Sequence, residues 1–168
     1  SFQKALRSLE TGRAGFGADG RDGRFESMSD ETLEAELIRP NADRVYEIRA
    51  AFKRGWSLEK VQILTAIDPY FLRNLEELAA FEEEIKAAKT PENLAKDPEF
   101  FRQIKEFGYS DRQLAFLLNS NELDVRNARK AINLEPIFST VDTCAGEFAA
   151  STPYFYASHH GRENEALP

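Results

Sequence analysis

Apolar residues recur with the period of an α-helix along most of the chain. Val45, Ile48 and Phe52 share one face of a helix that we expect to begin near residue 43 and to stop at Gly55. The longest pattern starts at Pro69 and is expected to end near residue 89. Its apolar stripe consists of Phe71, Leu75, Leu78 and Ile85, widened by Leu72 and Ala79. Because alternation typical of strands is scarce, the pattern predicts an all-α fold.

Three dipeptides in the sequence mark helix starts. They are Asp68-Pro69, Thr90-Pro91 and Asp97-Pro98. In each, a side-chain oxygen at the N-cap can accept a hydrogen bond from the first turn, and proline at the first helical position gives up no hydrogen bond. Ser29 is expected to start a shorter helix that runs to about Ile38, before Pro40.

A unit of about ten residues occurs twice. Gly55–Leu64 resembles Gly108–Leu117, and each copy reads as a glycine that ends a helix, an aromatic residue, a serine cap and a new helix. In the second copy Ser110 and Gln113 have the spacing of a capping box. We therefore expect two small packed helical subdomains, at about 29–89 and 90–135.

The remaining parts of the chain lack helical periodicity. Asn133 can adopt the left-handed turn that ends a helix, and Pro136 prevents the helix from resuming. The C-terminal segment is therefore predicted to be an irregular or extended strap. Between the first helix, at about 2–10, and the next, Gly15–Gly20 matches the pattern GxGxxG. A dinucleotide site needs a strand before this pattern and a helix after it, so we interpret the match as coincidental.

Composition narrows the class of protein. The 168 residues fit one domain or two small ones, and 22 basic against 29 acidic residues give a net charge of −7, which disfavours nucleic acid and anionic membranes as partners. No apolar stretch approaches the ~20 residues of a membrane span, and no signal segment opens the chain. A single cysteine excludes an internal disulfide and favours a cytoplasmic protein. Ser1 at the start, with Met28 as the only methionine, suggests a piece of a longer polypeptide.

Candidate catalytic residues are few. No lysine, arginine or histidine lies near Cys144 in the sequence, and the acidic Asp142 and Glu147 disfavour a thiolate, so a packing role is favoured over a nucleophile. His159 and His160 are adjacent and would point to opposite sides of an extended segment, as in a solvated tail. The run of glutamates at 82–84 is interpreted as a solvated helix face. We predict no catalytic, cofactor-binding or metal-binding residue in this chain.

One segment has the pattern of a DNA-binding motif. Residues 110–133 read as two short helices joined by a polar turn, as in a helix-turn-helix. The basic residues of the second helix are Arg126, Arg129 and Lys130. Against this function stand the acidic Glu122 and Asp124 at the start of that helix and the net charge of the chain. A DNA-binding or helical protein-interaction module using 110–133 is kept as the alternative.

Several longer segments together identify a family. They are QKALRSLE at 3–10, IDPYFLRNLEEL at 67–78, FGYSDRQLA at 107–115, VDTCAGEF at 141–148 and TPYFYAS at 152–158. With these segments, in this order, the sequence resembles the large chain of carbamoyl-phosphate synthase over nearly its whole length. Departures are small: Gly146 stands where the family has alanine, Ser139 or Thr140 where a basic residue is common, and His159-His160 where an acidic stretch is usual.

The resemblance implies a place within a larger enzyme. In that family the similar segment is an all-helical oligomerisation domain between two ATP-grasp halves, and it carries no catalytic residues. Residues 1–12 would then be the tail of the preceding synthetic domain, 13–140 the oligomerisation domain and 141–168 a connector toward the following ATP-grasp domain.

The resemblance also implies the chemistry and partners of the parent enzyme. It would make carbamoyl phosphate from bicarbonate, ammonia released from glutamine and two ATP, for arginine and pyrimidine biosynthesis. ATP, Mg or Mn, and K would bind elsewhere in that enzyme. The implied partners are the two ATP-grasp halves and the regulatory domain of the same chain, other copies of the large chain and a glutaminase small subunit.

Two sets of contact residues are expected. Leu33 and Leu37 on the helix at 30–38 are predicted to form an interface with an uncovered apolar face, the alternative being that they pack inside. The connector would be anchored by packing of Cys144, Phe148, Tyr154 and Tyr156. Without its following domain, this strap is expected to be partly disordered or to pair with a neighbouring molecule.

Overall fold

The fold was analysed in a computed structural model that describes residues 2–141, 143, 146–148, 154–161 and 163–166. Within these residues the chain forms ten helices and two strands. The helices are α1 (Phe2–Ser8), α2 (Gly23–Glu26), α3 (Asp30–Ile38), α4 (Arg44–Lys53), α5 (Leu58–Thr65), α6 (Pro69–Ala87), α7 (Pro91–Ala95), α8 (Pro98–Glu106), α9 (Asp111–Leu117) and α10 (Glu122–Ala131). The strands are β1 (Ile137–Val141) and β2 (Tyr154–Ser158).

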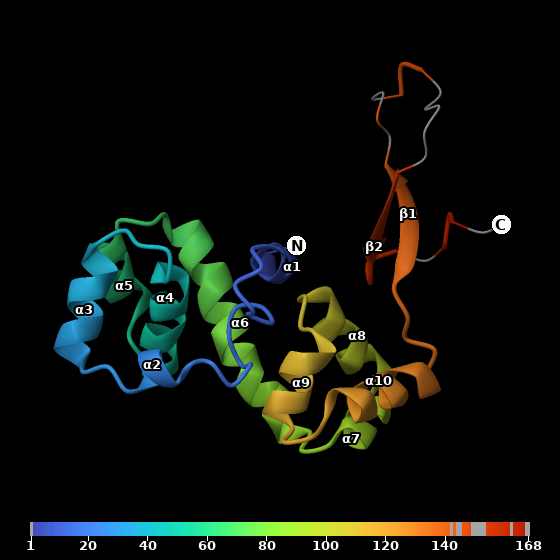
Figure 1. Ribbon diagram of the computed structural model, residues 1–168, viewed down its shortest axis with the longest axis horizontal. Coiled ribbons are helices and arrows are strands. Elements are labelled where there is room, and N and C mark those ends of the chain that lie inside the picture. Colours follow the sequence, from blue (N-terminus) through green and yellow to red (C-terminus); the bar gives the residue numbers. More distant parts are fainter. Residues whose placement is uncertain (1, 142, 144–145, 149–153, 162, 167–168) are drawn as a thin grey trace.

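The long helix α6 is the axis of the molecule. Figure 1 shows α2 to α5 gathered at one end of α6 and α7 to α10 gathered at its other end; these are the first and second helix groups. Helix α1 lies between the two groups, where Phe2 lines a groove together with Tyr70 and Phe71 of α6. The strands form a ribbon that projects from the second group (Figure 1).

Buried apolar residues fall into two clusters, one for each helix group. The first includes Phe16, Leu33, Leu37, Ile48 and Val61, and the second includes Phe101, Ile104, Leu114, Val125 and Leu134. Helix α6 contributes Leu72 and Ala79 to the first cluster and Phe81 and Ile85 to the second. Since a fully buried side chain of this kind stabilises the fold by about 1.5–3 kcal/mol, α6 ties the two groups together through apolar packing.

The predicted helix starts are confirmed. Asp68, Thr90 and Asp97 each accept a hydrogen bond from a backbone N–H in the first turn, and a proline follows each of them. Ser110 and Gln113 form the expected capping box at the start of α9. These contacts join residues that are close in sequence, so they could be predicted without the tertiary structure.

The predicted helix ends are also confirmed. Gly55, Gly108 and Asn133 have positive φ angles of 77°, 89° and 55°. After each of them, the next N–H reaches back five residues to a helix carbonyl, as from Trp56 to Ala51 at 3.1 Å. This is the hydrogen bond of a Schellman motif, which satisfies carbonyls that the end of a helix leaves free.

The predicted all-α chain is mostly helical, but the C-terminal strap, expected to be irregular or extended, forms a two-stranded sheet. β1 and β2 pair antiparallel, with Ile137 opposite Ser158 and Val141 opposite Tyr154. Both strands are rich in aromatic and β-branched residues, which favour this conformation. Neither strand has one buried and one exposed face, so no clear alternation marked them in the sequence. Among the described residues, no helix has the length and apolar character needed to cross a membrane.

Candidate functional site: the junction of the two helix groups

The glycine-rich loop between α1 and α2 is buried at the junction of the helix groups. Ala14, Phe16 and Ala18 are at most 5% exposed. Phe16 belongs to the first apolar cluster and Ala18 to the second. The loop therefore contributes to both cores, although its sequence has the composition of a surface turn.

The two glycines Gly15 and Gly17 are required by close packing. A Cβ at Gly15 would lie 2.6 Å from Oε1 of Gln3, and one at Gly17 would lie 2.6 Å from Nε of Arg49. Neither distance is possible without movement of a buried side chain. The glycines of the GxGxxG pattern thus allow the loop to approach three elements of its own chain.

The amides of this loop donate to carboxylates of the same loop. The N–H of Ala14 donates to Asp19 Oδ2 and the N–H of Ala18 donates to Asp22 Oδ2, both at 2.8 Å. In a dinucleotide site the loop amides face the phosphates of the ligand. Here these two are already paired, in agreement with the interpretation of the pattern as coincidental.

Two buried glutamines join the start of the chain to the second helix group. Gln113 of α9 donates through Nε2 to Oε1 of Gln3 at 2.8 Å and to the carbonyl of Gly17 at 2.9 Å. Gln3 of α1 donates to the carbonyl of Phe107 at 3.1 Å. Each side chain is at most 1% exposed, so these hydrogen bonds replace those that water would make. Their loss would leave buried polar atoms unpaired.

A buried ion pair joins α4 to α6. Arg49 donates through Nε and Nη2 to the two carboxylate oxygens of Glu82, at 2.8 and 2.7 Å. Its Nη1 lies 3.2 Å from Oδ2 of Asp22 in the glycine-rich loop. Burial opposes the charge of Arg49, but the hydrogen bonds and charge of Glu82, together with Asp22, outweigh burial and raise the pKa of Arg49. The expectation that residues 82–84 form a solvated face is wrong for Glu82, which is 2% exposed.

Arg13 extends this ionic network within the loop. Its guanidinium pairs with Asp19 at 3.2 Å and with Asp22, and it stacks over the ring of Tyr46 of α4 at 4.2 Å. The carboxylates of Asp19, Asp22 and Glu82 thus pair with the guanidinium groups of Arg13 and Arg49. The ammonium of Lys53 also lies 3.4 Å from Glu82. Paired in this way, the charges can remain ionised inside the protein.

The aromatic residues of the sequence repeat have different roles. Tyr109 is 2% exposed and donates its hydroxyl hydrogen to the carbonyl of Leu78 in the middle of α6. Burial and the charge of Glu82 raise the pKa of Tyr109. Trp56, its counterpart, is only partly buried and carries the Lys60 ammonium 3.5 Å from its ring centre. The repeat conserves the helix end and the serine cap, but one copy alone contributes to the junction.

The structure contradicts the predicted apolar interface on α3. Leu33 and Leu37 are fully buried in the first cluster, so the alternative that they pack inside is correct. The reason is that α3 packs on α4 and α5 with this face inward. Ile38 at the end of α3 is the large apolar residue of this helix that is exposed, at 60%.

Three of the four predicted connector anchors lie among the described residues, and these three are exposed. Phe148, Tyr154 and Tyr156 are 75%, 60% and 51% exposed, so they are not packed as expected. Cys144 lies outside the described residues. β2 pairs with β1 of its own chain, so the expectation that the strap would pair with a neighbouring molecule is wrong for residues 154–158.

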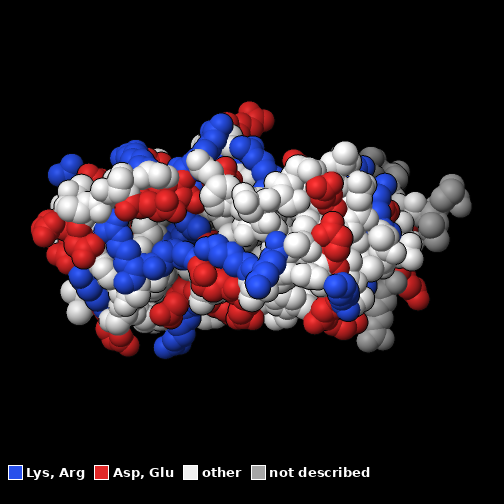
Figure 2. Space-filling model, turned by 90° about the horizontal axis from the view of Figure 1, so that it is seen from below, with Lys and Arg blue, Asp and Glu red and all other residues white. Residues whose placement is uncertain are grey.

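The helix-turn-helix alternative is not supported. Arg129 of α10 pairs with Asp111 at 3.1 Å and donates to the carbonyl of Leu134 at 2.7 Å, while Lys130 lies 3.8 Å from Glu135. These side chains are therefore engaged within the chain. On the face in Figure 2, acidic side chains lie beside the basic ones, whereas a DNA-binding face gathers basic residues without such acidic neighbours.

Comparison with known proteins agrees with this architecture. The family model described as "Carbamoyl-phosphate synthetase large chain, oligomerisation domain" matches residues 1–133. The matched part contains all ten helices of the described residues and every member of the junction. The fold and this match define the class of protein as a mostly helical oligomerisation domain.

Similar proteins cover nearly the whole chain. A "Carbamoyl phosphate synthase large chain" from Archaeoglobus fulgidus is 44% identical over 168 residues, which are 99% of this chain and 15% of that protein. The "N-terminal section" of such a chain from Aquifex aeolicus is 44% identical over 93% of this chain and 26% of its own length. An "arginine-specific large chain, chloroplastic" from Oryza sativa is 42% identical over this whole chain and 14% of its own length.

The chain belongs to the carbamoyl-phosphate synthetase large chain family and corresponds to its oligomerisation domain. It spans about 15% of the length of the full large chains that it matches.

Proposed function

We propose that this domain is a non-catalytic structural module of a carbamoyl-phosphate synthase large chain. It holds the preceding and following parts of that chain in a fixed relation and takes part in association with further copies. The observation that carries the proposal is the buried junction, in which Gln3 and Gln113 join α1 to α9, and Arg49 and Glu82 join α4 to α6. A flexible linker would leave the flanking parts independent.

The first helix and strand β2 lie close together, which supports this role. Lys4 of α1 donates to the carbonyl of Ala157 in β2 at 3.2 Å, and Arg7 donates to the carbonyl of Gly108 at 2.9 Å. Arg129 of α10 donates to the carbonyl of Leu134, which lies between α10 and β1. Segments on either side of the domain would thus start from neighbouring points.

We infer the parent activity and partners from the family resemblance, which the relatives' names support. The parent would make carbamoyl phosphate from bicarbonate, ammonia from glutamine and two ATP, with ATP, Mg or Mn, and K bound outside this domain. Its two ATP-grasp halves, its regulatory domain and a glutaminase small subunit would be the partners. Residues 1–12 would end the preceding synthetic domain, and 141–168 would lead into the following one.

A mutation of the junction in the full-length parent chain tests the structural role. Replacing Gln113 by alanine removes its hydrogen bonds to Gln3 and to the carbonyl of Gly17, and so loosens α1 from α9. The expected result is a lower rate of carbamoyl phosphate synthesis, while ATP turnover by each half persists. Small-angle X-ray scattering should show a wider range of interdomain distances. Unchanged synthesis together with unchanged scattering in a variant with a loosened junction would disprove a positioning role.

Self-association has its own supporting observation. Tyr70 and Phe71 at the start of α6 are 66% and 60% exposed and pack edge to face, with ring centres 5.4 Å apart. They border a groove of about 590 Å³ that also contains Phe2 and Phe107. Such exposed aromatic surface is typical of protein contacts. Sedimentation velocity of the parent chain with Phe71→Glu should show smaller assemblies, while Ile63→Glu on α5 serves as the exposed control.

A further inference from the structure

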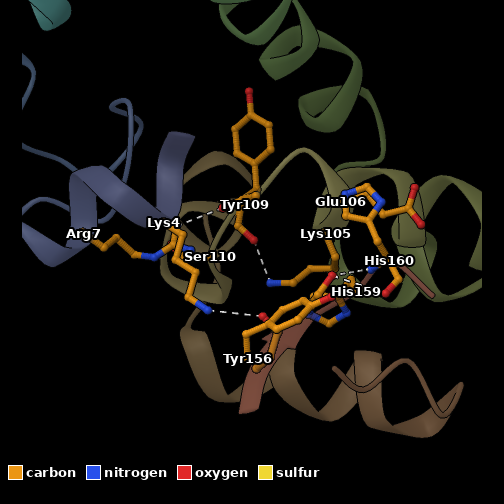
Figure 3. A pocket seen from close by; sticks show the side chains of 12 residues that line it. Lys4, Arg7, Lys105, Glu106, Tyr109, Ser110, Tyr156, His159 and His160 are labelled. Carbon is orange, nitrogen blue, oxygen red and sulfur yellow. Dashed lines mark hydrogen bonds between the residues drawn. The ribbon is translucent and has the colours of Figure 1, made fainter. Parts of the chain in front are cut away.

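A pocket of about 380 Å³ lies between α1, the end of α8 and strand β2. Figure 3 shows Lys4, Lys105, Tyr156 and His159 around it, contributed by segments that are far apart in the sequence. Its volume is in the range of small-molecule sites. The expectation that His159 belongs to a solvated tail is wrong, because β2 carries this residue back onto α8.

Two cations on α1 face this pocket without a carboxylate partner. Lys4 donates to the carbonyl of Ala157 at 3.2 Å. Arg7, one turn later, donates through Nη1 to the carbonyls of Ala14 and Gly108 at 3.2 and 2.9 Å. Among the described residues, neither side chain forms an ion pair, and burial lowers the pKa of Arg7. Neutral carbonyls thus offset only part of these charges.

His159 adds an unpaired polar atom. Its Nδ1 is buried and has no hydrogen-bond partner among the described residues. The charged groups around its ring are Lys105 and Arg102 of α8, Asp111 of α9 and Arg129 of α10. Burial, followed by Lys105 and Arg129, lowers the pKa of His159 to about 4, against the opposing effect of Asp111. The ring is therefore neutral near pH 7, and one nitrogen can donate a hydrogen bond.

The charge of the pocket is opposite to that of the chain. Lys4, Arg7 and Lys105 line it, and among the described lining residues Glu106 is the only carboxylate. Lys105 donates to Asp111 and to the carbonyl of Tyr109, both at 2.7 Å, which leaves Lys4 and Arg7 as the cations without a carboxylate partner. The chain as a whole carries a net charge of −7. A local excess of positive charge in a cleft attracts small anions.

We propose that this pocket binds a small tetrahedral oxyanion of the phosphate class between Lys4, Arg7 and His159. The anion would pair with both cations and accept a hydrogen bond from the imidazole, and such charge-assisted hydrogen bonds are the stronger kind in proteins. The site goes beyond the structural role proposed above. It does not depend on that role, because the Arg49–Glu82 ion pair and the Gln3–Gln113 hydrogen bond of the junction form without a ligand.

The chain has only two histidines, His159 and His160, so NMR of their ring protons is a direct test. In chloride buffer, the 168-residue chain should show His159 titrating well below the ordinary value of 6.5. Inorganic phosphate should raise the pKa of His159 in a saturable way, because a bound anion favours the imidazolium. His160 is the internal control and should not respond. Sodium chloride at equal ionic strength should have no such effect.

Two variants sharpen the test. Lys4→Gln, at an exposed position, should weaken phosphate binding about tenfold, the effect of losing one charge-assisted hydrogen bond. Lys96→Gln, at an exposed lysine between α7 and α8 that does not line the pocket, should leave the affinity unchanged. Phosphate should raise the melting temperature of the unmodified chain but not that of His159→Leu, which gives a readout independent of the histidine signals.

Three results would overturn the proposal. One is that phosphate shifts the pKa of both histidines equally and that Lys4→Gln does not alter these shifts. Phosphate would then have a general ionic effect only. Another is an ordinary pKa for His159 without phosphate, which means that β2 does not close the pocket. A third is equal stabilisation of the unmodified chain and His159→Leu by phosphate. None of these would affect the proposed structural role, which is tested by synthesis and scattering of the parent chain.

Discussion

Lys4 near the beginning of the chain donates a hydrogen bond to the carbonyl of Ala157 in its last strand, at 3.2 Å. This contact brings together segments that are separated by both helix groups. The same end of α1 holds Gln3, which is hydrogen-bonded to Gln113 of α9. The N-terminal helix is therefore the element that connects the start of the domain, its centre and its C-terminal strands.

Removing one partner of the Arg49–Glu82 pair should destabilise the fold more than replacing both partners by apolar residues. Glu82→Ala leaves Arg49 buried without its main partner, and the free energy of unfolding should fall by about 3–5 kcal/mol. The double variant Arg49→Met with Glu82→Leu should lose much less, because no unpaired charge remains and Asp22 keeps Arg13. Urea denaturation of the three proteins measures this. Equal losses in the single and double variants would contradict a buried, coupled pair.

Gly17 should not tolerate a side chain. A Cβ there would meet the Arg49 guanidinium at 2.6 Å, at a φ of +133°, so Gly17→Ala should destabilise the domain by about 1–3 kcal/mol. Gly23→Ala is the matched control, because no atom lies within 4 Å of its added Cβ and α2 starts there. It should be neutral or stabilising by up to about 1 kcal/mol. Thermal unfolding followed by circular dichroism separates the two, and equal melting temperatures would count against the close packing.

Leu37 should behave as a core residue and its neighbour Ile38 as a surface residue. Leu37→Ala should lower the free energy of unfolding by about 2–5 kcal/mol, since the side chain is fully buried. Ile38→Ala, at 60% exposure, should change it by no more than about 0.5 kcal/mol. Chemical denaturation of both variants checks the assignment. A small effect of Leu37→Ala would restore the original interpretation of α3 as an uncovered face.

Glu47 should make stability depend on pH. It is buried on α4, Asn41 donates to its Oε2 at 3.0 Å, and its Oε1 has no partner among the described residues. Burial raises its pKa above the ordinary 4.5. The folded chain thus binds this proton more tightly than the unfolded chain. The contribution of Glu47 to stability is therefore fully present below pH 4.5 and is lost as the pH rises through the raised pKa.

Glu47→Gln removes this titration while keeping an oxygen for Asn41. The variant should melt at a higher temperature than the unmodified chain at pH 7, and the difference should shrink as the pH is lowered below 4.5. Calorimetric scans at several pH values measure the effect. A difference that stays constant with pH would show that the carboxyl of Glu47 is not responsible.

The junction itself could not be predicted, for a physical reason that each of its residues illustrates. Glu82 lies in a run of three glutamates, and only the packing of α4 on α6 turns it inward while Glu83 stays exposed. The loop around Gly15 has the composition of a surface turn, yet Gln3 and Gln113 enclose it. Burial of a polar group depends on partners distant in sequence, which leave no local pattern.

The sequence by itself determined where most helices begin and end, because caps such as Asp97 before Pro98 and stops such as Gly108 act over a few neighbouring residues. It also determined the family, through segments that together span the chain. The tertiary structure alone decided that Leu33 faces inward, that β2 returns to β1, and that His159 and Lys105 line the same pocket. These outcomes follow from apolar burial and hydrogen bonding between segments far apart in the chain, which no local periodicity records.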